Sequence, residues 1–301
     1  MGQQHLIVPQ EHQAERLDVY LTKVLPDVPS RTFIKKLIDD GRVLVNDKPA
    51  KANHKVAADE RVCVDIDDDA FAPIDIEPEN IPLNIFYEDE CLVVINKPVG
   101  MLVHPTDSIF TGTMVNALLY HFKKLSSVNT RMRPGIVHRL DMDTSGLLVV
   151  AKDNRTHHRL AKQFARHTVK KKYLAFVNGL VKFEEGKINE PLGRHALHRE
   201  QRDVIYTPDG KESVTFYKVI KRLSKCTYVA LFPQTGRTHQ LRVHMAHIGH
   251  PILGDEKYGH KKSFPRLALH AQSIGFTHPN SGHFVEFSCS PPAEFLKKLQ
   301  E

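Results

Sequence analysis

The stretch HRLDMDTSGLLVVAK, residues 138–152, joins a polar segment to an apolar run. Residues 147–151 are apolar and follow turn-forming residues, which predicts a buried β-strand. A carboxylate at the mouth of a core strand is costly to bury unless it has a partner or a chemical role. Asp141 therefore needs an explanation. We expect the residues after it merely to build the turn: Asp143, Thr144 and Ser145.

Further strand signals follow from residue 85 onward: LVVINKP, LLVVAK, YLAFVNG, VTFYKVI, TYVALF and FVEFS. Three stretches between them have helical spacing: TMVNALLYHF, RTHHRLAKQFARH and THQLRVHMAHIG. Many strands with few helices, and hairpin-sized gaps among the later strands, are typical of an α+β domain. We therefore expect a domain over residues 85–301 with a mixed, largely antiparallel β-sheet.

The first part of the chain predicts a separate small α/β domain over residues 16–66, after a tail formed by residues 1–15. A helix over RTFIKKLID begins after Ser30 and ends at Gly41. A hairpin follows, with its turn at Asn46-Asp47 and a return towards Val62-Cys63-Val64. The cations of this helix could clamp phosphates, or they could be the charged face of an ordinary module: Arg31, Lys35 and Lys36. Residues 67–84 are rich in acids and proline and predict a linker that avoids polyanions.

Charge distribution points to a polyanionic partner for the larger domain. The net charge is +7, and residues 121–172 contain thirteen Lys and Arg against three Asp. Such a concentration is expected of a nucleic-acid binder, although a solvated helix face would look similar. The four cysteines are dispersed and form no CxxC pair, and no secretory signal or membrane span is evident. We expect a cytoplasmic protein that does not interact with membranes.

Several familiar motifs are absent. HRLD differs from a kinase catalytic loop in the position of its acid, and neither a phosphate-binding loop nor a dinucleotide fingerprint occurs. His244, His247 and His250 recur at every third position, which rotates successive side chains around a helix. We expect these histidines to face solvent or RNA, and we predict no metal site.

Two further polar groups stand at the ends of predicted elements. Tyr173 opens the strand YLAFVNG, where it could equally be a core aromatic with its hydroxyl at the rim. In TGRTHQLRVHMAHIG, residues 235–249, Thr238 is the expected N-cap. Arg242 lies near that helix start, where a cation opposes the helix dipole. The position becomes favourable if Arg242 faces a carboxylate, and Asp141 is the candidate. Asp141 would then stay ionised and could act as a nucleophile.

These blocks resemble the motifs of the RluA family of RNA pseudouridine synthases. HRLDMDTSGLLVVAK is similar to the family signature HRLDxxTSGLLLLAK. Four other blocks resemble its remaining motifs: INKPVGMLVHP, KKYLAFVNG, TGRTHQLRVHMAHIGHPILGDEKYG and RLALHAQSIGFTHP. Residues 16–66 similarly resemble the small RNA-binding domain first known from ribosomal protein S-four. The resemblance covers most of the chain.

The resemblance implies a role for five residues. Asp141 would be the catalytic aspartate, attacking the uridine at its ring or at the anomeric carbon of its ribose. Tyr173 would stack on the uracil, and Arg242 would pair with Asp141. Arg139 would help displace the target base, and Leu269 would pack beside the site. No cofactor is implied, since isomerising uridine to pseudouridine involves no redox change and no external group.

The expected function is therefore the isomerisation of uridines in large-subunit (23S) ribosomal RNA, free or in pre-ribosomal particles, by a monomer. Three alternatives remain open from sequence. The substrate could be transfer RNA. The protein could be an RNA-binding ribosome-assembly factor with an inactive catalytic remnant. A metal-dependent hydrolase built on the histidines is the third alternative, although no acid–histidine ligand pattern supports it.

Overall fold

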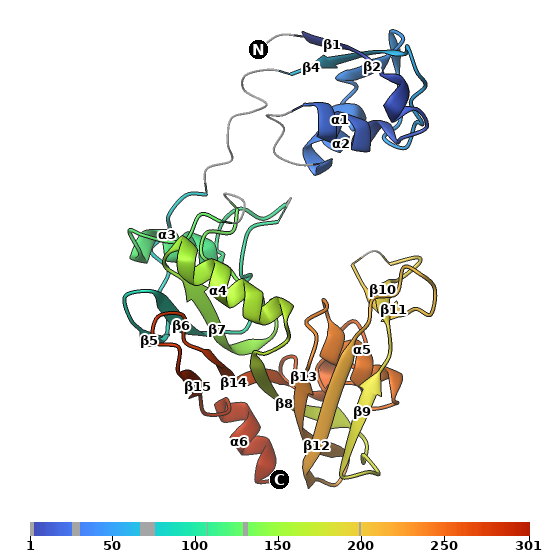
Figure 1. Ribbon diagram of the computed structural model, residues 1–301. Coiled ribbons are helices and arrows are strands. Elements are labelled where there is room, and N and C mark those ends of the chain that lie inside the picture. The colour runs from blue at the N-terminus through green and yellow to red at the C-terminus, as the bar shows by residue number, and fades with distance from the viewer. Residues whose placement is uncertain (1–2, 26–30, 67–75, 107, 129–131, 199) are drawn as a thin grey trace. The chain divides into compact units, whose positions relative to one another are not determined.

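The computed structural model describes residues 3–25, 31–66, 76–106, 108–128, 132–198 and 200–301 (Figure 1). The chain forms two compact units, Met1–Asp75 and Ile76–Glu301. Within the described ranges, no helix is both long enough and apolar enough to cross a membrane.

The first unit packs two helices on a four-stranded sheet in the order β1-β4-β2-β3. Its elements are β1 (Gln3–Ile7), the 3-10 helix η1 (Gln10–His12), α1 (Leu17–Val24), α2 (Arg31–Asp39), β2 (Val43–Val45), β3 (Lys48–Pro49) and β4 (Arg61–Asp65). Asn46 and Asp47 have φ of 48° and 62°, as the tight β2–β3 turn requires of residues that tolerate the left-handed region. The predicted helix is confirmed, and the strand before the turn pairs both with β3 and, as predicted, with residues 62–64 of β4. Ser30, the predicted N-cap of the helix, lies outside the described residues. Residues 3–7, expected in a tail, instead pair with β4 and extend the sheet.

The second unit is built on a nine-stranded sheet in the order β5-β6-β7-β14-β8-β13-β12-β9, with β15 also paired to β14. The strands are β5 (Ile85–Glu88), β6 (Leu92–Lys97), β7 (Ser145–Ala151), β8 (Lys170–Asn178), β9 (Glu185–Asn189), β12 (Val214–Arg222), β13 (Cys226–Pro233), β14 (Leu269–Thr277) and β15 (Phe284–Ser288). Among the strands that the structure describes, only the β7–β14 pair is parallel, which confirms the expected mixed, largely antiparallel sheet. A separate two-stranded ribbon consists of β10 (Leu192–Arg194) and β11 (Arg202–Val204).

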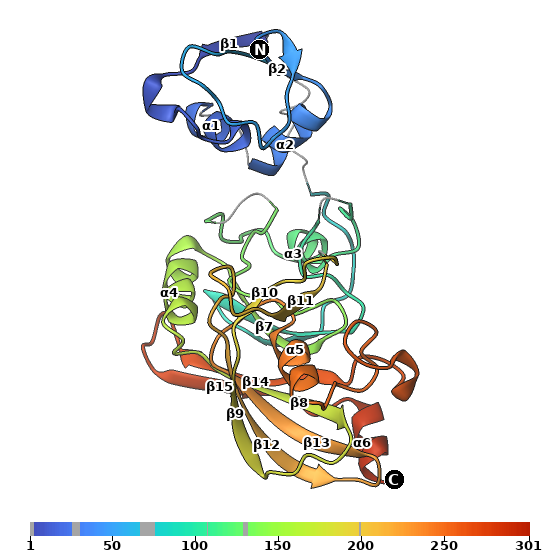
Figure 2. The ribbon, with the colours of Figure 1, turned by 90° about the vertical axis from the view of Figure 1, so that its right-hand side faces the viewer.

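The helices of this unit cover the sheet at separate places (Figures 1 and 2). They are α3 (Met114–His121), α4 (Asn154–Ala165), α5 (Gln240–His247), the 3-10 helix η3 (Lys261–Ser263) and α6 (Ala293–Leu299). The three stretches with helical spacing form α3, α4 and α5, as predicted. Helix α4 contacts β7 and β14, whereas α5 contacts β12 and β13. Residues 76–84, expected in the linker, belong to this unit, and Ile76 is buried in its core. Residues 67–75 of that linker lie outside the described residues.

Gly146, in the stretch of residues 138–152, allows β7 and β14 to approach each other closely. It has φ of +115° and lies opposite Ala271 where β7 and β14 run parallel. A Cβ atom at this position would come 2.2 Å from the Ala271 carbonyl oxygen. Because only glycine fits this close backbone approach, the Ser145-Gly146 pair brings β7 beside β14 directly after the loop that carries Asp141.

Candidate active site

Asp141 lies in the loop before β7, and a buried lysine holds that loop. Lys97, at the end of β6, is 0% exposed. Its Nζ donates to the carbonyl oxygens of Pro98, Met101 and Met142 at 2.8, 2.9 and 2.9 Å. Burial lowers the pKa of Lys97 to about 8, although the negative charges of Asp143 and Asp141 act in the opposite direction and raise it. The ammonium thus ties the loop around Asp141 to the segment after β6.

Arg242 of α5 contacts two carboxylates. Its Nη1 lies 3.6 Å from Asp141 Oδ2, so the pair expected from the sequence is present. Its main partner is Asp255, which accepts Nε at 2.7 Å and Nη2 at 2.8 Å. The Asp255 side chain is 0% exposed and that of Arg242 5%, so both charges are desolvated. Burial opposes the charge on Arg242, but the contact with Asp255 outweighs it and raises the pKa of Arg242. The fork geometry fixes the guanidinium beside Asp141.

The start of α5 is formed by His239 rather than by the expected Thr238 cap. His239 adopts φ of 58°, and its side chain does not cap the helix. Its Nδ1 lies 2.8 Å from the Tyr258 hydroxyl, which accepts the Arg202 N–H at 2.7 Å. Burial lowers the pKa of His239 to about 4, so the ring is neutral near pH 7.

The five residues of the expected site line one cavity of about 490 Å³: Arg139, Asp141, Tyr173, Arg242 and Leu269. The loop before β7, the end of α4, β8 and the segment leading into α5 form its walls. Burial raises the pKa of Tyr173, and the Asp141 charge adds to this effect, so the phenol stays protonated. Leu269 is buried at the start of β14, whereas Arg139 is exposed. The structure therefore brings together residues from four distant motifs.

His138 connects this loop to α4. Its ring stacks on Phe164 with centroids 4.7 Å apart, and its Nε2 accepts the Val149 N–H at 3.0 Å. Burial lowers the pKa of His138 to about 3, so the ring is neutral and its role is to position the loop. Lys171, on the same cavity wall, donates to the Thr235 carbonyl at 3.1 Å, and burial lowers its pKa to about 8.

The cations expected to clamp phosphates in the first unit have different surroundings. Arg31 binds Asp18 through Nε at 3.0 Å and Nη2 at 2.9 Å, and Asp18 itself is buried. Lys35 is exposed on α2, and the side chain of Lys36 lies outside the described residues. Half of the Arg31 side chain remains exposed, so the ion pair with Asp18 does not remove it from the surface.

The histidines spaced by three do not converge on one point. His244 is completely buried, with Nδ1 2.9 Å from Thr215 Oγ1 and Nε2 3.0 Å from the Glu190 carbonyl oxygen. The expectation that His244 faces solvent or RNA is therefore wrong, because the ring fastens α5 to β12. His247 is exposed, and His250 contacts the Asn178 carbonyl through Nδ1 at 2.8 Å.

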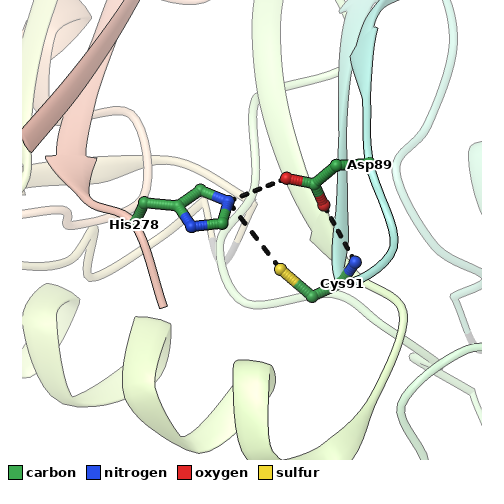
Figure 3. A group of neighbouring side chains, drawn as sticks. All are labelled: Asp89, Cys91 and His278. Atoms are coloured by element: carbon green, nitrogen blue, oxygen red, sulfur yellow. Dashed lines mark hydrogen bonds and ion pairs between the residues drawn. The ribbon is translucent and has the colours of Figure 1, made fainter. Parts of the chain in front are cut away.

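A different group has the composition of a metal site, namely Asp89, Cys91 and His278 (Figure 3). His278 Nε2 lies 2.8 Å from Asp89 Oδ2 and 3.8 Å from Cys91 Sγ. The N–H groups of Asn280 and Ser281 point to Nδ1 at 3.3 Å, so Nε2 carries the proton and donates to Asp89. Two tetrahedral zinc ligands would lie about 3.4 Å apart. The spacing is therefore that of a hydrogen bond, which ties the β5–β6 turn to the segment after β14.

Sequence reasoning missed the residues that support the site. Lys97 ends the apolar run LVVINK, and a cation that continues a buried strand is a signal that it binds carbonyl groups. Asp255 and Tyr258 lie within the block HPILGDEKYG, and its resemblance to a family motif implies no role for either residue. The local sequence pattern does not indicate that they pack against Arg242, because this contact is formed by the tertiary fold. In the structure, the Arg242 guanidinium carbon lies 5.2 Å from the Tyr258 ring centroid.

Comparison with known proteins identifies both units. Residues 91–247 match the RNA pseudouridylate synthase family, and residues 15–62 match the S4 domain. An uncharacterized RNA pseudouridine synthase of Bacillus subtilis (strain 168) is 42% identical over 100% of this chain and 99% of its own length. The ribosomal large subunit pseudouridine synthase D of Zymomonas mobilis is 40% identical over 98% of this chain and 96% of its own length.

A solved structure agrees with the sequence comparisons. Human RNA pseudouridylate synthase domain containing 1 has a TM-score of 0.59 and 28% identity, covering 72% of this chain and 86% of its own. Fold and site thus define an RNA-modifying isomerase with an RNA-binding module. The chain belongs to the RNA pseudouridylate synthase family. It is an RNA pseudouridine synthase with an N-terminal S4 domain.

Proposed function

We propose that this enzyme isomerises uridines of large-subunit ribosomal RNA, free or within pre-ribosomal particles, with Asp141 as the nucleophile and without a cofactor. The observation that carries the proposal is the cavity in which Asp141 lies 3.6 Å from an arginine held by a second, buried carboxylate. The ribosomal target is supported by relatives that are named ribosomal large subunit pseudouridine synthase D, such as the Zymomonas mobilis protein.

The proposed reaction needs one nucleophile and exclusion of water. The uridine first leaves its stack, at a cost of about a few kcal/mol. Asp141 then adds either to the anomeric carbon or to the uracil ring, and the bond between the anomeric carbon and N1 breaks. The uracil turns and its C5 bonds to the anomeric carbon. The bond between Asp141 and the substrate breaks and frees the carboxylate, the C5 proton is lost, and N1 gains a proton. Atoms and electrons balance without redox chemistry.

The other cavity residues have distinct roles in this proposal. Tyr173, protonated and half-buried, stacks on the displaced uracil and shields it from water. Arg242, 3.6 Å from Asp141, orients its carboxylate, and Leu269 closes the apolar side of the cavity. Arg139, exposed at the rim, helps displace the base and holds the RNA.

The nucleophile is tested by a matched pair of variants. Asp141→Asn keeps the shape of the side chain but removes the charge, and we expect single-turnover pseudouridine formation to fall below detection while RNA affinity stays within about twofold. Asp143→Asn, two residues away and outside the cavity lining, should keep most of the activity. Wild-type turnover by Asp141→Asn would rule out its role as the nucleophile.

The RNA target is tested in cells. Carbodiimide mapping of ribosomal and transfer RNA with and without this gene should show pseudouridines that disappear from large-subunit ribosomal RNA and return on complementation. Loss confined to transfer RNA would overturn the ribosomal assignment but leave the isomerase activity standing.

A further inference from the structure

We propose that the outward face of α4 is the surface along which the phosphodiester backbone of the substrate RNA lies as its uridine enters the cavity. The surface consists of Arg155, Arg159, Lys162 and Arg166, called here the α4 basic stripe. This inference rests on the proposed function and deepens it, because it assigns a docking surface for the RNA that flanks the reacting uridine.

The spacing of the stripe places its four cations on one side of the helix. Intervals of four, three and four residues keep the side chains within an arc of about 60° at 100° per residue. All four are exposed. The opposite face is buried through Thr156, His157 and Leu160. A helix with its apolar side against the sheet thus presents one continuous row of cations outward.

The stripe has little compensating negative charge. The acid that interacts with it is Asp153, the helix cap, whose carboxylate attracts Arg155. After Asp153 no acid occurs in the sequence until Glu184. None of the ion pairs found among the described residues involves a member of the stripe. Neighbouring like charges one turn apart repel each other and disfavour the helix. A solvated face usually mixes both signs, so a row of one sign indicates a polyanion that relieves the repulsion.

Several contacts hold the helix rigidly beneath the stripe. The Asp153 carboxylate caps its N-terminus by accepting the Thr156 N–H at 2.8 Å. Near its end, Gln163 exchanges two hydrogen bonds with the backbone of Thr277, at 2.7 and 2.8 Å. Arg159 also donates to the Pro279 carbonyl oxygen. The cations therefore project from a fixed support, which favours binding of a regular phosphate backbone.

The stripe leads to the cavity that contains Asp141. Phe164, Ala165 and His167, at the C-terminal end of α4, line this cavity. With a rise of about 1.5 Å per residue, the stripe extends about 16 Å from this rim. Figure 1 shows α4 lying in front of β7, the strand that follows the Asp141 loop. RNA bound along α4 would therefore deliver one of its nucleotides to Asp141.

The test is a triple neutralisation of the stripe in the full-length protein: Arg155→Gln, Lys162→Gln and Arg166→Gln. Arg159 is kept because it binds backbone. The probe is an unmodified transcript of bacterial large-subunit ribosomal RNA. We expect the Kd to rise at least about tenfold at 0.15 M salt, and the slope of log affinity against log salt to fall by about 2 to 3. The single-turnover rate at saturating RNA should stay within about twofold.

A second triple variant controls for net charge: Lys187→Gln, Lys218→Gln and Lys225→Gln. These lysines are exposed on β9, on β12 and in the turn after it, and they do not line the cavity. The control should change Kd less than about threefold. Equal Kd and equal salt slope for the two triple variants would overturn the proposal that the α4 basic stripe binds RNA. So would a loss of the saturated rate without a loss of affinity. Failure of the wild type to form pseudouridine would refute the proposed function alone, since the binding comparison does not depend on it.

Discussion

Replacing Asp255 by asparagine tests the support of the site most sharply. In the wild type, two charge-assisted hydrogen bonds at 2.7 and 2.8 Å join Asp255 to Arg242, and both side chains are nearly inaccessible to solvent. Asparagine keeps one acceptor but turns an N–H₂ donor toward a guanidinium donor. Removing one partner of a buried pair typically costs about 3–5 kcal/mol, because the other charge stays buried and uncompensated. We expect a loss of that size in the free energy of unfolding.

The assay is urea unfolding of the full chain, followed by far-UV circular dichroism at pH 7. Only the transition of the Ile76–Glu301 unit should shift, since Asp255 belongs to that unit. The matched control is Glu256→Gln, whose carboxylate makes an exposed ion pair with Lys261 at 2.6 Å. An exposed pair contributes at most about 1 kcal/mol. If Asp255→Asn costs no more than Glu256→Gln, then Asp255 does not hold Arg242 in place.

Two further predictions concern stability. Burial lowers the pKa of His104, His239 and His270 to about 4, from the ordinary histidine value of 6.5. Between pH 6.5 and 4 the unfolded chain therefore binds more protons than the folded chain. The free energy of unfolding should fall as the pH decreases through this window. Each histidine contributes at most about 1.4 kcal/mol per pH unit. Urea midpoints at pH 7, 6 and 5 check this, and equal midpoints would contradict it. Gly146→Ala should lower the free energy of unfolding by about 2–3 kcal/mol, because the new Cβ would overlap the Ala271 carbonyl oxygen; a wild-type urea midpoint would refute this explanation of the β7–β14 contact.

The sequence predicted local structure well where periodicity carries the information. The apolar run after Gly146 is a fully buried strand, and the Asn46-Asp47 turn joins β2 to β3. The resemblance to a family also placed Asp141, Tyr173 and Arg242 together, and the structure finds all three on one cavity. These residues lie in sequence blocks that resemble the family motifs closely enough to be aligned with them residue by residue.

Long-range partners could not be predicted in the same way. The spacing around Arg242 shows that it lies near a helix start, but not that Asp255, thirteen residues later, binds it with both oxygens. For the same reason His244 looked like a surface residue, although Thr215 and a backbone carbonyl bury it. A hydrophobic pattern reports which side of an element is covered. It does not report which distant polar group covers it.

The most direct measurement follows the C5 hydrogen of the substrate. A large-subunit ribosomal RNA transcript made with uridine tritiated at C5 is incubated with the purified, chelator-treated wild-type protein. Bonding of C5 to the ribose must expel that hydrogen, so tritium should appear in water in proportion to the pseudouridine formed. Intact tritium at every uridine after prolonged incubation with excess protein would contradict the account.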